Sequence, residues 1–413
     1  MPSTFTTRTT CRICASSLLK HVLSLGHHFV NNFVPPGQAY VGEACPIELV
    51  ECQYCSLVQN PHTAPQELLY SGHYWYKSGT TDTMRKALAD VVKAATSQVD
   101  LHTGDVVLDI GSNDGTLLRH YCPALFRVGV EPATNMRGVG SGGIDLFINS
   151  FWTAENYFSA MENTVRALIP KAKVITAIGM FYDLEDPNQF IADIAKALHR
   201  DGVFIAQLMC LQNMLNVGDI GNLAHEHLEF YTLRSLEYML NAHGLELYDI
   251  ETNTVNGESY RLFIQHRMGS RQTSYRVAEA RNAENRISDR LYDFWKAVEA
   301  NKRKVVDFIR DAKRLGKKIW VYGASTKGNT ILQYYQLGPW DIVGAAERDP
   351  DKWGKVMIGS NVPIYSEEVA RNAKCDYFLV LPFAFINEFV QREQAFITRG
   401  GKFIVPLPEM RII

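Results

Sequence analysis

The sequence of 413 residues contains no long apolar segment. No uninterrupted apolar run approaches the roughly 18 residues that a helix needs to cross a bilayer. The first residues, MPSTFTTRTT, have no apolar core of the kind found in secretory signal peptides. We therefore expect a cytoplasmic protein with no membrane partner.

The chain also has no excess of charge of either sign. Lys and Arg number 42 and Asp and Glu number 44, so the formal net charge is −2 with the 12 histidines counted as neutral. Proteins that bind nucleic acid usually carry a basic surface, so we expect no nucleic-acid partner. Hydrophobic residues make up 46% of the chain and charged residues 21%, which is ordinary for a globular protein. The length predicts two or three domains.

Two motifs of known chemistry are absent, the Walker loop G-x-x-x-x-G-K-[ST] and the zinc-protease motif H-E-x-x-H, and no complete G-x-G-x-x-G directly follows a strand-like run. The chain has instead Val106–Leu118, VVLDIGSNDGTLL, where a β-type run ends in Asp109 and glycines follow at Gly111 and Gly115. A new apolar stretch begins at Leu117. This order of strand, tight loop and helix start is typical of a nucleotide-binding α/β domain.

The residues of this loop favour S-adenosylmethionine over a dinucleotide. Asn113 occupies the place of the second glycine of the dinucleotide motif, and Asp114 would bring a negative charge near a pyrophosphate. S-adenosylmethionine has no phosphate and carries a sulfonium cation, so acids at Asp109 and Asp114 are tolerable or helpful. Glu131 ends the next apolar run and could accept hydrogen bonds from both ribose hydroxyls. The alternative is a glycine turn that binds nothing.

Four of the eight cysteines form two C-x-x-C pairs, Cys11 with Cys14 and Cys52 with Cys55. In a reducing compartment this spacing indicates zinc and not disulfides. Four thiolates fill a tetrahedral Zn²⁺ site and leave no position for water, so the metal would be structural. The alternative is two unrelated pairs of reduced thiols. Cys45 lies in the same region but belongs to neither pair. We interpret three further cysteines as small buried apolar residues: Cys122, Cys210 and Cys375.

The segments around the loop predict a parallel sheet covered by helices. We expect short strands and turns up to about residue 70 and a helix over Thr81–Gln98. Strands follow at Phe126–Val130, Val174–Ile178 and Val203–Met209, with a helix over Pro187–Leu198. Met180 and Phe181 come directly after the strand at Val174, at the sheet edge that faces a ligand, so we predict that they contact the cofactor.

Two further stretches are candidates for catalysis. Tyr74-Trp75-Tyr76 either packs between domains or forms a wall over the active site, with a tyrosine hydroxyl as a donor. His225, Glu226 and His227 are three titratable residues in a row. They suggest a general base, a neutral imidazole oriented by a carboxylate. The alternative is a polar cluster that caps the following helix, Leu233–Ala242.

The last part of the chain predicts a second α/β domain. A strand over Val255–Ile264 and one mostly charged helix between Thr273 and Lys313 lead to it. Its strand and glycine loop, IWVYGASTKGNT, begin at Ile319. Ser325, Thr326 and Lys327 stand at a helix start in a loop that contains no acid, which suits phosphate oxygens. The alternative is a glycine turn with a surface lysine.

Together these motifs resemble the sugar C-methyltransferases of deoxysugar biosynthesis over nearly the whole chain. The marks of the resemblance are the four paired cysteines, Tyr74-Trp75-Tyr76, DIGSNDGTLL, GVEPA, the HEH stretch, VNGESYR, YGASTKGN and FIVPLP. The resemblance implies a class I Rossmann-like α/β methyltransferase domain with a small N-terminal zinc-binding module and a C-terminal Rossmann-like α/β domain. We place the zinc-binding module at 1–72, the methyltransferase domain at 73–270, a linking helix at 271–313 and the nucleotide-sugar-binding domain at 314–413.

The resemblance also implies a reaction: methylation at C-3 of a nucleotide-linked 4-keto-6-deoxy sugar, with dTDP as the expected nucleotide. A carbon beside a ketone is weakly acidic, so a base must remove its proton before the enolate takes the methyl group. By resemblance His227 is the base, Glu226 its partner and Tyr76 a donor near the sugar, with His225 as a further catalytic candidate. The candidate substrate-binding residues are Tyr74, Tyr182, Asn256, Ser325, Thr326, Lys327, Asn329 and Glu347.

The chain departs from the family pattern at Ala224 and Tyr182, two positions that line the sugar pocket in the family. The resemblance therefore leaves the identity of the sugar open. Three other functions remain as alternatives: an O- or N-methyltransferase acting on a similar sugar, a zinc-module RNA methyltransferase and a non-catalytic ligand-binding protein. We expect that the protein can function as a monomer.

Overall fold

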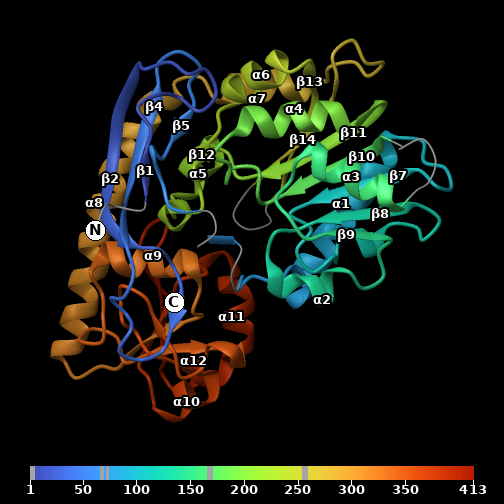
Figure 1. Ribbon diagram of the computed structural model, residues 1–413. Helices are drawn as coiled ribbons and strands as arrows, with labels where there is room; N and C mark the ends of the chain where they lie inside the picture. The colour runs from blue at the N-terminus through green and yellow to red at the C-terminus, as the bar shows by residue number, and fades with distance from the viewer. Residues whose placement is uncertain (1–4, 66–68, 71–73, 165–170, 254–258) are drawn as a thin grey trace.

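The computed structural model describes residues 5–65, 69–70, 74–164, 171–253 and 259–413. Figure 1 shows a central α/β domain, a second α/β domain from the C-terminal part of the chain, and an N-terminal module whose long strands run beside both. The candidate Asn256 lies outside the described residues. Among the residues described, no helix is both long and apolar enough to cross a membrane.

The central domain is built on a seven-stranded sheet in the order β13-β14-β11-β10-β7-β8-β9. The five strands from β9 to β11 pair in parallel, and β14 runs antiparallel to both β11 and β13. β7 is buried at every residue, as a central parallel strand covered by helices on both faces should be. The strands are β7 Val106–Ile110, β8 Phe126–Val130, β9 Leu146–Ile148, β10 Ala172–Ile178, β11 Leu198–Leu208, β13 Leu245–Asn253 and β14 Ser259–His266.

The helices of this domain begin at residues suited to capping. The Thr81 side chain accepts a hydrogen bond from the first turn of α1, and Asp186 with Pro187 does the same for α4. Thr232 and Ser235 form a reciprocal capping box at the start of α6. The helices are α1 Asp82–Gln98, α2 Arg137–Gly140, α3 Ala154–Thr164, α4 Pro187–Ala197, α5 Leu211–Val217 and α6 Leu233–Ala242.

The chain after the first glycine loop differs from the predicted helix. Leu118–His120 forms a single 3₁₀ turn. Pro123 explains the early stop, because a proline disfavours helical backbone in the residue before it. This first loop therefore leads to no long helix whose N-terminus could hold a pyrophosphate.

The N-terminal module contains longer strands than the sequence pattern indicated. β2, Leu19–Phe29, pairs antiparallel with β4, Ala44–Cys52, through two irregularities in register. Short strands complete the module: β1 Thr6–Thr7, β3 Phe33–Val34, β5 Val58–Gln59 and β6 His62–Thr63. Its sheet has the order β12-β5-β4-β2, and β12, Glu229–Phe230, belongs to the central domain. Central domain and module therefore share one sheet.

The C-terminal domain confirms the predicted second α/β unit. Its six-stranded sheet has the order β18-β16-β15-β19-β20-β21, and all neighbours pair in parallel except β20 with β21. The strands are β15 Ile319–Tyr322, β16 Ala345–Glu347, β18 Ile364–Ser366, β19 Tyr377–Val380, β20 Lys402–Val405 and β21 Arg411–Ile412. The helices are α9 Thr326–Tyr335, α10 Glu367–Asn372, α11 Ile386–Arg392 and α12 Gln394–Thr398. A separate strand, β17 Val356–Met357, pairs with β3 of the module.

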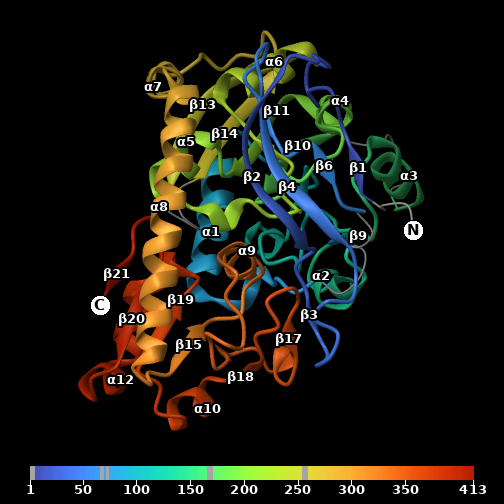
Figure 2. The same ribbon diagram turned by 90° about the vertical axis from the view of Figure 1, so that its left-hand side faces the viewer.

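The connection between the two α/β domains is two helices and not one. α7 spans Tyr275–Ala283 and α8 spans Ile287–Arg314, with Arg286 between them at a φ of 64°. Figure 2 shows α8 running along the module and past both α/β domains. Its apolar stripe, which includes Leu291, Val298 and Val305, is buried in a core shared with the module and the C-terminal domain.

Candidate active site

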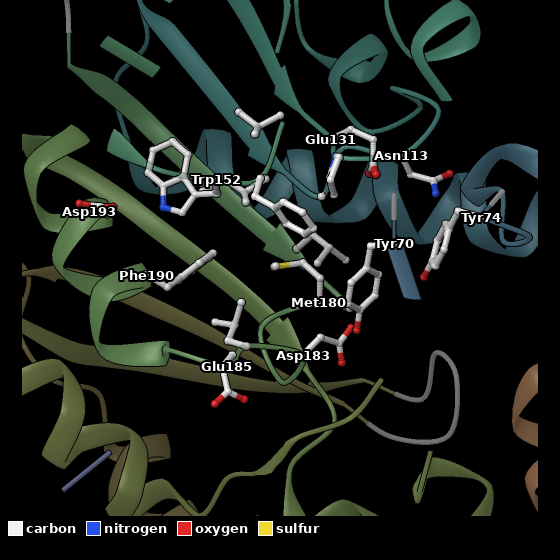
Figure 3. A pocket seen from close by; sticks show the side chains of 18 of the residues that line it. Tyr70, Tyr74, Asn113, Glu131, Trp152, Met180, Asp183, Glu185, Phe190 and Asp193 are labelled. Atoms are coloured by element: carbon white, nitrogen blue, oxygen red, sulfur yellow. The ribbon is translucent and has the colours of Figure 1, made fainter. Parts of the chain in front are cut away.

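A cavity of about 340 Å³ opens beside the carboxyl ends of β7, β8 and β10. Figure 3 shows Glu131 and Asn113 on one side of it and Trp152, Phe190 and Asp193 on another. In open α/β sheets ligands bind at this edge. Of the predicted site residues, six line the cavity: Tyr74, Tyr76, Gly111, Asn113, Glu131 and Met180.

The glycine loop is held from above by the aromatic stretch that precedes α1. The side chain of Asn113 accepts a hydrogen bond from the Ser78 backbone and donates one to the Tyr76 carbonyl. The carboxylate of Asp114 accepts from the Gly79 backbone at 2.7 Å. Asp114 is therefore committed to holding this segment, and it does not line the cavity among the residues described. The segment forms a wall over the loop.

Gly115 explains why this loop needs glycine. Its φ is +75°, and a Cβ at this position would lie 2.6 Å from the Gly140 carbonyl oxygen. Gly111 has a φ of +70°, and a Cβ there would meet the Met180 side chain at 2.9 Å. Both glycines serve backbone conformation and close packing, and Gly111 also lines the cavity.

Glu131 stands where a ribose would be bound. One of its oxygens accepts from the Asn113 backbone at 2.9 Å and the other from the Ala133 backbone at 2.8 Å. A carboxylate has about four acceptor positions, so two remain for ligand hydroxyls. Burial raises the pKa of this group, and the two backbone donors oppose that effect.

Asp109 has a different position from the one expected. It is 3% exposed, and its carboxyl accepts a hydrogen bond from the Thr176 hydroxyl at 2.6 Å. Burial raises its pKa to about 7. In the described part of the chain Asp109 does not line the cavity, so it joins β7 to β10 and does not face a sulfonium.

Phe181 also turns away from the cavity. Its ring is fully buried and stacks on Tyr231 at 5.3 Å between centroids. Met180, the residue before it, points into the cavity (Figure 3). The direction of a side chain in a turn after a strand does not follow from its apolar character. The sequence pattern therefore predicts the same cofactor contact for both neighbours.

Most of the other residues that line the cavity were not predicted from the sequence, and four of them are polar or aromatic residues at its two ends: Phe151, Trp152, Tyr70 and Asp183. Phe151 and Trp152 follow β9, and Figure 3 shows Trp152 on the side of the cavity that also holds Phe190. Tyr70 and Asp183 lie at the other end, and Figure 3 shows the Tyr70 hydroxyl pointing toward the Asp183 carboxyl. Asp183 belongs to the segment after the strand that also contains Met180, and this position in the sequence could have predicted that it lies at the cavity.

Asp183 and Glu226 form a buried acidic pair beside the cavity. Asp183 Oδ1 and Glu226 Oε2 are buried and have no hydrogen-bond partner among the described residues. Burial, followed by the charge of Glu226, holds the pKa of Asp183 well above its usual range. Burial likewise raises the pKa of Glu226, while Lys327 opposes both shifts.

His227 is fixed in one tautomer next to this pair. Its Nδ1 lies 2.7 Å from the backbone oxygen of Asn222. A carbonyl only accepts, so Nδ1 carries the hydrogen and Nε2 keeps its lone pair. Burial and the charge of Lys327 lower the pKa of His227 to about 3. The imidazole is therefore neutral at pH 7, and its ring meets that of Tyr182 edge-on at 4.6 Å.

Lys327 comes to this cluster from the C-terminal domain. Its Nζ donates to the Asn222 side-chain oxygen at 2.6 Å. Its charge also acts on Asp219, Asp183 and Glu226, whose raised pKa values it lowers in part. The second glycine loop thus meets the first domain beside His227.

His225 is not brought to the site. Its Nε2 lies 3.0 Å from the backbone oxygen of Cys45 in the N-terminal module. It is 1% exposed, and burial lowers its pKa to about 4. His225 and His227 therefore face different neighbours although one residue separates them.

The other candidates of the second glycine loop have local partners. Ser325 accepts from the Gly328 backbone and caps α9, of which Thr326 is the first residue. Asn329 is fully buried and bonds to Asn31, Ser360 and the Ile358 carbonyl. Its amide supports the contact with the N-terminal module and does not reach the loop surface.

Glu347 repeats in the second domain the arrangement seen at Glu131. Its Oε2 accepts from the Ala324 backbone in the glycine loop at 2.8 Å, and Oε1 accepts from the Arg348 and Asp349 backbones. Lys352 lies 3.7 Å from Oε2. In both domains an acid at the carboxyl end of one strand, β8 or β16, thus accepts hydrogen bonds from the glycine loop that follows the neighbouring strand, β7 or β15.

The four paired cysteines converge as a zinc site requires. Their sulfur atoms all lie within 4.8 Å of one another, and the pairs Cys11–Cys55 and Cys14–Cys52 are each 3.5 Å apart. Tetrahedral Zn–S bonds of about 2.3 Å place sulfurs about 3.8 Å apart, so the set fits a closed structural Zn²⁺ site. Cys45, Cys210 and Cys375 are buried as expected, whereas Cys122 is exposed.

The cavity likewise fits S-adenosylmethionine. Its lining includes the carboxylate of Glu131, which has open acceptor positions, and the aromatic residues Phe151 and Trp152. The glycine loop that lines it offers no side chain that would bind a phosphate. Thus the fold and the cavity define an S-adenosylmethionine-dependent methyltransferase, an enzyme that also carries a structural zinc site.

Comparisons with known proteins agree with this class. Three family models match in succession: a zinc binding domain at residues 11–70, a methyltransferase domain at 81–250 and the C-methyltransferase C-terminal domain at 254–408. The chain is 28% identical over 411 residues to the C-methyltransferase NovU of Streptomyces niveus, covering 98% of this chain and 96% of that protein. The chain is therefore similar to C-methyltransferases over nearly its whole length.

Solved structures with some likeness include two methyltransferases. Magnesium protoporphyrin IX methyltransferase from Synechocystis PCC 6803 with bound S-adenosylmethionine is 13% identical, with a TM-score of 0.32, over 44% of this chain and 78% of that chain. An S-adenosylmethionine-dependent methyltransferase from Clostridium acetobutylicum is 15% identical, with a TM-score of 0.34, over 45% and 93%. The similarity to C-methyltransferases rests on the sequence matches.

Proposed function

We propose that the protein methylates C-3 of a nucleotide-linked 4-keto-6-deoxy sugar, with dTDP as the expected nucleotide. One observation carries the proposal. His227, with a free Nε2 lone pair, lies in a buried cluster that joins the cofactor cavity through Asp183 to Lys327 of the C-terminal domain. This arrangement would let a base, a methyl-donor cavity and a nucleotide-binding loop act together.

In the proposed reaction His227 Nε2 takes the C-3 proton of the ketosugar. Its neutral state suits this task, because only an unprotonated imidazole accepts a proton. The positive charge of Lys327 opposes the imidazolium that forms, and the carboxyls of Glu226 and Asp183 in the same cluster would offset it. Glu226 would therefore act through charge, since the Asn222 carbonyl and not Glu226 engages Nδ1.

The enolate oxygen at C-4 needs a hydrogen-bond donor. Tyr74 and Tyr76 line the cavity, and burial followed by the nearby acids keeps the pKa of Tyr74 well above its usual range, so its hydroxyl stays a donor. Such a donor stabilises the charge that develops on the oxygen. S-adenosylmethionine, when bound, supplies the methyl group that forms the new bond at C-3 as its bond to sulfur breaks.

The C-terminal domain would hold the nucleotide. Ser325, Thr326 and Lys327 stand at the start of α9, and Glu347 fixes the loop before them. Lys327 donates a hydrogen bond to the Asn222 side chain. We propose that it serves both the substrate phosphates and the cluster around His227.

The test is mass spectrometry in heavy water with a panel of dTDP-4-keto-6-deoxy sugars, with and without S-adenosylmethionine. We expect a gain of one methyl group with the cofactor and deuterium uptake beside the ketone without it. His227→Asn should lose both, while His225→Gln, which alters the histidine facing Cys45, should lose neither.

Other outcomes separate the alternatives. Methyl gain on oxygen or nitrogen would identify a heteroatom acceptor and overturn carbon methylation. Methylation of RNA with strong dependence on salt would favour the RNA enzyme. If none of the sugars in the panel is methylated or binds, the ketosugar proposal is wrong.

A further inference from the structure

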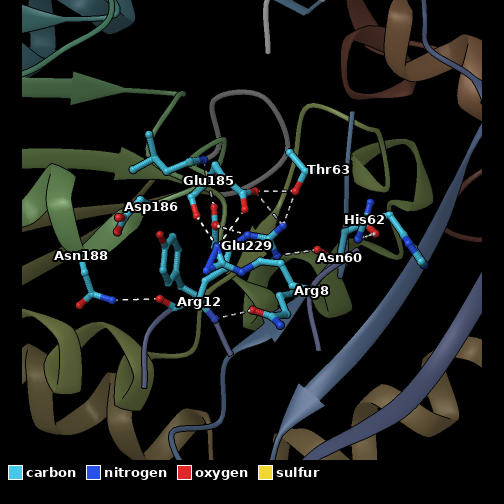
Figure 4. A network of polar contacts seen from close by, with 12 residues as sticks. Arg8, Arg12, Asn60, His62, Thr63, Glu185, Asp186, Asn188 and Glu229 are labelled. Atoms are coloured by element: carbon cyan, nitrogen blue, oxygen red, sulfur yellow. Dashed lines mark hydrogen bonds and ion pairs between the residues drawn. The ribbon is translucent and has the colours of Figure 1, made fainter. Parts of the chain in front are cut away.

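Arg12 lies between two zinc ligands, Cys11 and Cys14, yet its side chain leaves the zinc site. The guanidinium has no exposed surface and enters the contact between the N-terminal module and the central domain. Nη1 donates to the Asn60 carbonyl at 2.6 Å and Nη2 to the Thr63 hydroxyl at 2.7 Å. Figure 4 shows Arg12 at the centre of this network. A fully buried cation needs such partners.

The acidic partners of Arg12 belong to the central domain. Nη2 donates to Glu185 at 3.2 Å, and Nε lies 3.6 Å from Glu229 Oε1. Thr63 donates to the same Glu185 oxygen at 2.5 Å, which closes a triangle between the three residues. Within the described residues, Glu229 Oε1 has no hydrogen-bond partner, so Arg12 is the cation that compensates it.

These acids hold one wall of the cofactor cavity. The other Glu229 oxygen accepts from the Leu184 backbone at 3.2 Å, and the Leu228 and Glu229 amides both donate to the Tyr182 carbonyl. Leu184 and Glu185 themselves line the cavity. The segment from Tyr182 to Glu185 is thus fixed by groups that depend on Arg12.

The backbone of the same zinc turn holds the adjoining helix. Asn188 in the first turn of α4 donates to the Arg12 and Ile13 carbonyls at 2.9 and 3.0 Å. Its neighbours Gln189 and Phe190 line the cavity. Side chain and backbone of the zinc turn therefore fix two consecutive pieces of the same wall.

We propose that Arg12 is a positioning residue that couples the zinc site to the cofactor cavity, so that S-adenosylmethionine binds tightly only when zinc holds the turn around Cys11 and Cys14. Zinc fixes this turn in place, and the turn fixes Arg12 and the Asn188 contacts. Without the metal the turn loses its cross-link, and the wall over 182–190 loses its support.

The test measures binding of S-adenosylhomocysteine to the full chain by calorimetry, together with zinc content. Arg12→Met should weaken binding about tenfold while one zinc per chain remains. Arg12→Lys, which keeps the charge, should recover part of the loss. The matched control is Arg8→Ala, because Arg8 also binds Glu185 at 2.9 Å but from the partly exposed side. The control should leave affinity unchanged.

Hydrogen exchange gives the second readout. Amides of 182–190 should exchange faster in Arg12→Met and in chelated wild type, whereas those of the 323–330 loop should not change. Removal of zinc from Arg12→Met by a chelator should add little to the loss of affinity. The substitution and the chelator both break the same connection between the zinc turn and the cavity wall. A merely structural role would lower the melting temperature and leave affinity unchanged where the protein is folded.

Two results would overturn the proposal: full affinity in zinc-loaded Arg12→Met, or full affinity in chelated, folded wild type. If Arg12→Met does not fold, Thr63→Val replaces it, because this variant removes only the hydroxyl between Arg12 and Glu185. It should weaken binding severalfold, and unchanged affinity would count against the coupling. None of these readouts uses the sugar, so they are independent of the proposed substrate.

Discussion

Lys327 and His227, residues of two different domains, are joined through Asn222. Lys327 Nζ donates to the side-chain oxygen of Asn222 at 2.6 Å, and His227 Nδ1 donates to its backbone oxygen at 2.7 Å. The lysine thereby sits near enough to lower the pKa of the imidazole. The electrostatics of the candidate base are set in part by the C-terminal domain.

Removing this lysine should change the pH dependence of catalysis. A base must be unprotonated, so kcat/KM falls below the pKa of His227 in the free enzyme. Lys327→Met removes a cation that lowers this pKa, and the acidic limb of the profile should therefore move to higher pH. Because the pKa of His227 is about 3, profiles of kcat/KM that begin below pH 3 measure the shift. The control is Lys352→Met, which removes a lysine that contacts Ala324 and Glu347 and should not move the acidic limb of the pH profile. If the acidic limb lies at the same pH in both variants, the assignment of His227 as the base is contradicted.

Glu131 and Glu347 offer a paired test of the two loops. Glu131→Gln should weaken binding of S-adenosylhomocysteine by about tenfold to a hundredfold, since a charged acceptor for hydroxyls is worth about 1.5–3 kcal/mol. Glu347→Gln should leave that affinity unchanged and weaken binding of the nucleotide sugar instead. Titration of each variant with each ligand measures both effects. Loss of S-adenosylhomocysteine binding in Glu347→Gln would show that the two loops do not act separately.

Gly115→Ala should destabilise the protein through a backbone clash. A Cβ there meets the Gly140 carbonyl oxygen at 2.6 Å, in addition to the cost of a φ of +75°. We expect a loss of about 3 kcal/mol or more in the free energy of unfolding. Gly104→Ala is the control: its φ is +86° with nothing within 4 Å of the new Cβ, and its loss should be about 1 kcal/mol. Urea unfolding compares them, and equal losses would refute the clash.

Asp109 should make stability fall as pH rises. Its native pKa of about 7 exceeds the unfolded value of about 3.9. The native state therefore binds more protons between these values, and stability is lost from about pH 4 to pH 7. Asp109→Asn removes this dependence and keeps an acceptor for Thr176. Relative to wild type, the variant should gain about 3 kcal/mol between pH 5 and pH 8. Urea unfolding at both pH values measures it, and a constant difference would mean that Asp109 ionises normally.

The sequence predicted the central sheet well because its signals are local. The run at Phe126–Val130 matches β8 residue for residue, and α6 matches the predicted Leu233–Ala242. Each is a short apolar or amphipathic run bounded by turn residues or a cap. The converging cysteine pairs were likewise readable, because metal-ligand spacing is itself a local pattern.

What the sequence did not predict depends on partners far along the chain. β2 is eleven residues long because β4 pairs with it, although its own pattern, LKHVLSLGHHF, alternates poorly. Asn329 belongs to a loop that suits phosphates, yet α9 turns it toward Asn31. The burial of Asp109 has no signal in sequence either, since its partner Thr176 lies on another strand.

The strand pair β3–β17 has a consequence for building hybrid enzymes. Phe33 and Val34, near the start of the chain, complete the strand at Val356 and Met357, and the Ile358 amide donates to the Asn32 carbonyl. A graft that exchanges only the C-terminal half between relatives would separate these partners and leave backbone groups unpaired on both. The C-terminal domain therefore depends on a segment that is distant in the gene, and a working graft has to carry residues 32–34 along with it.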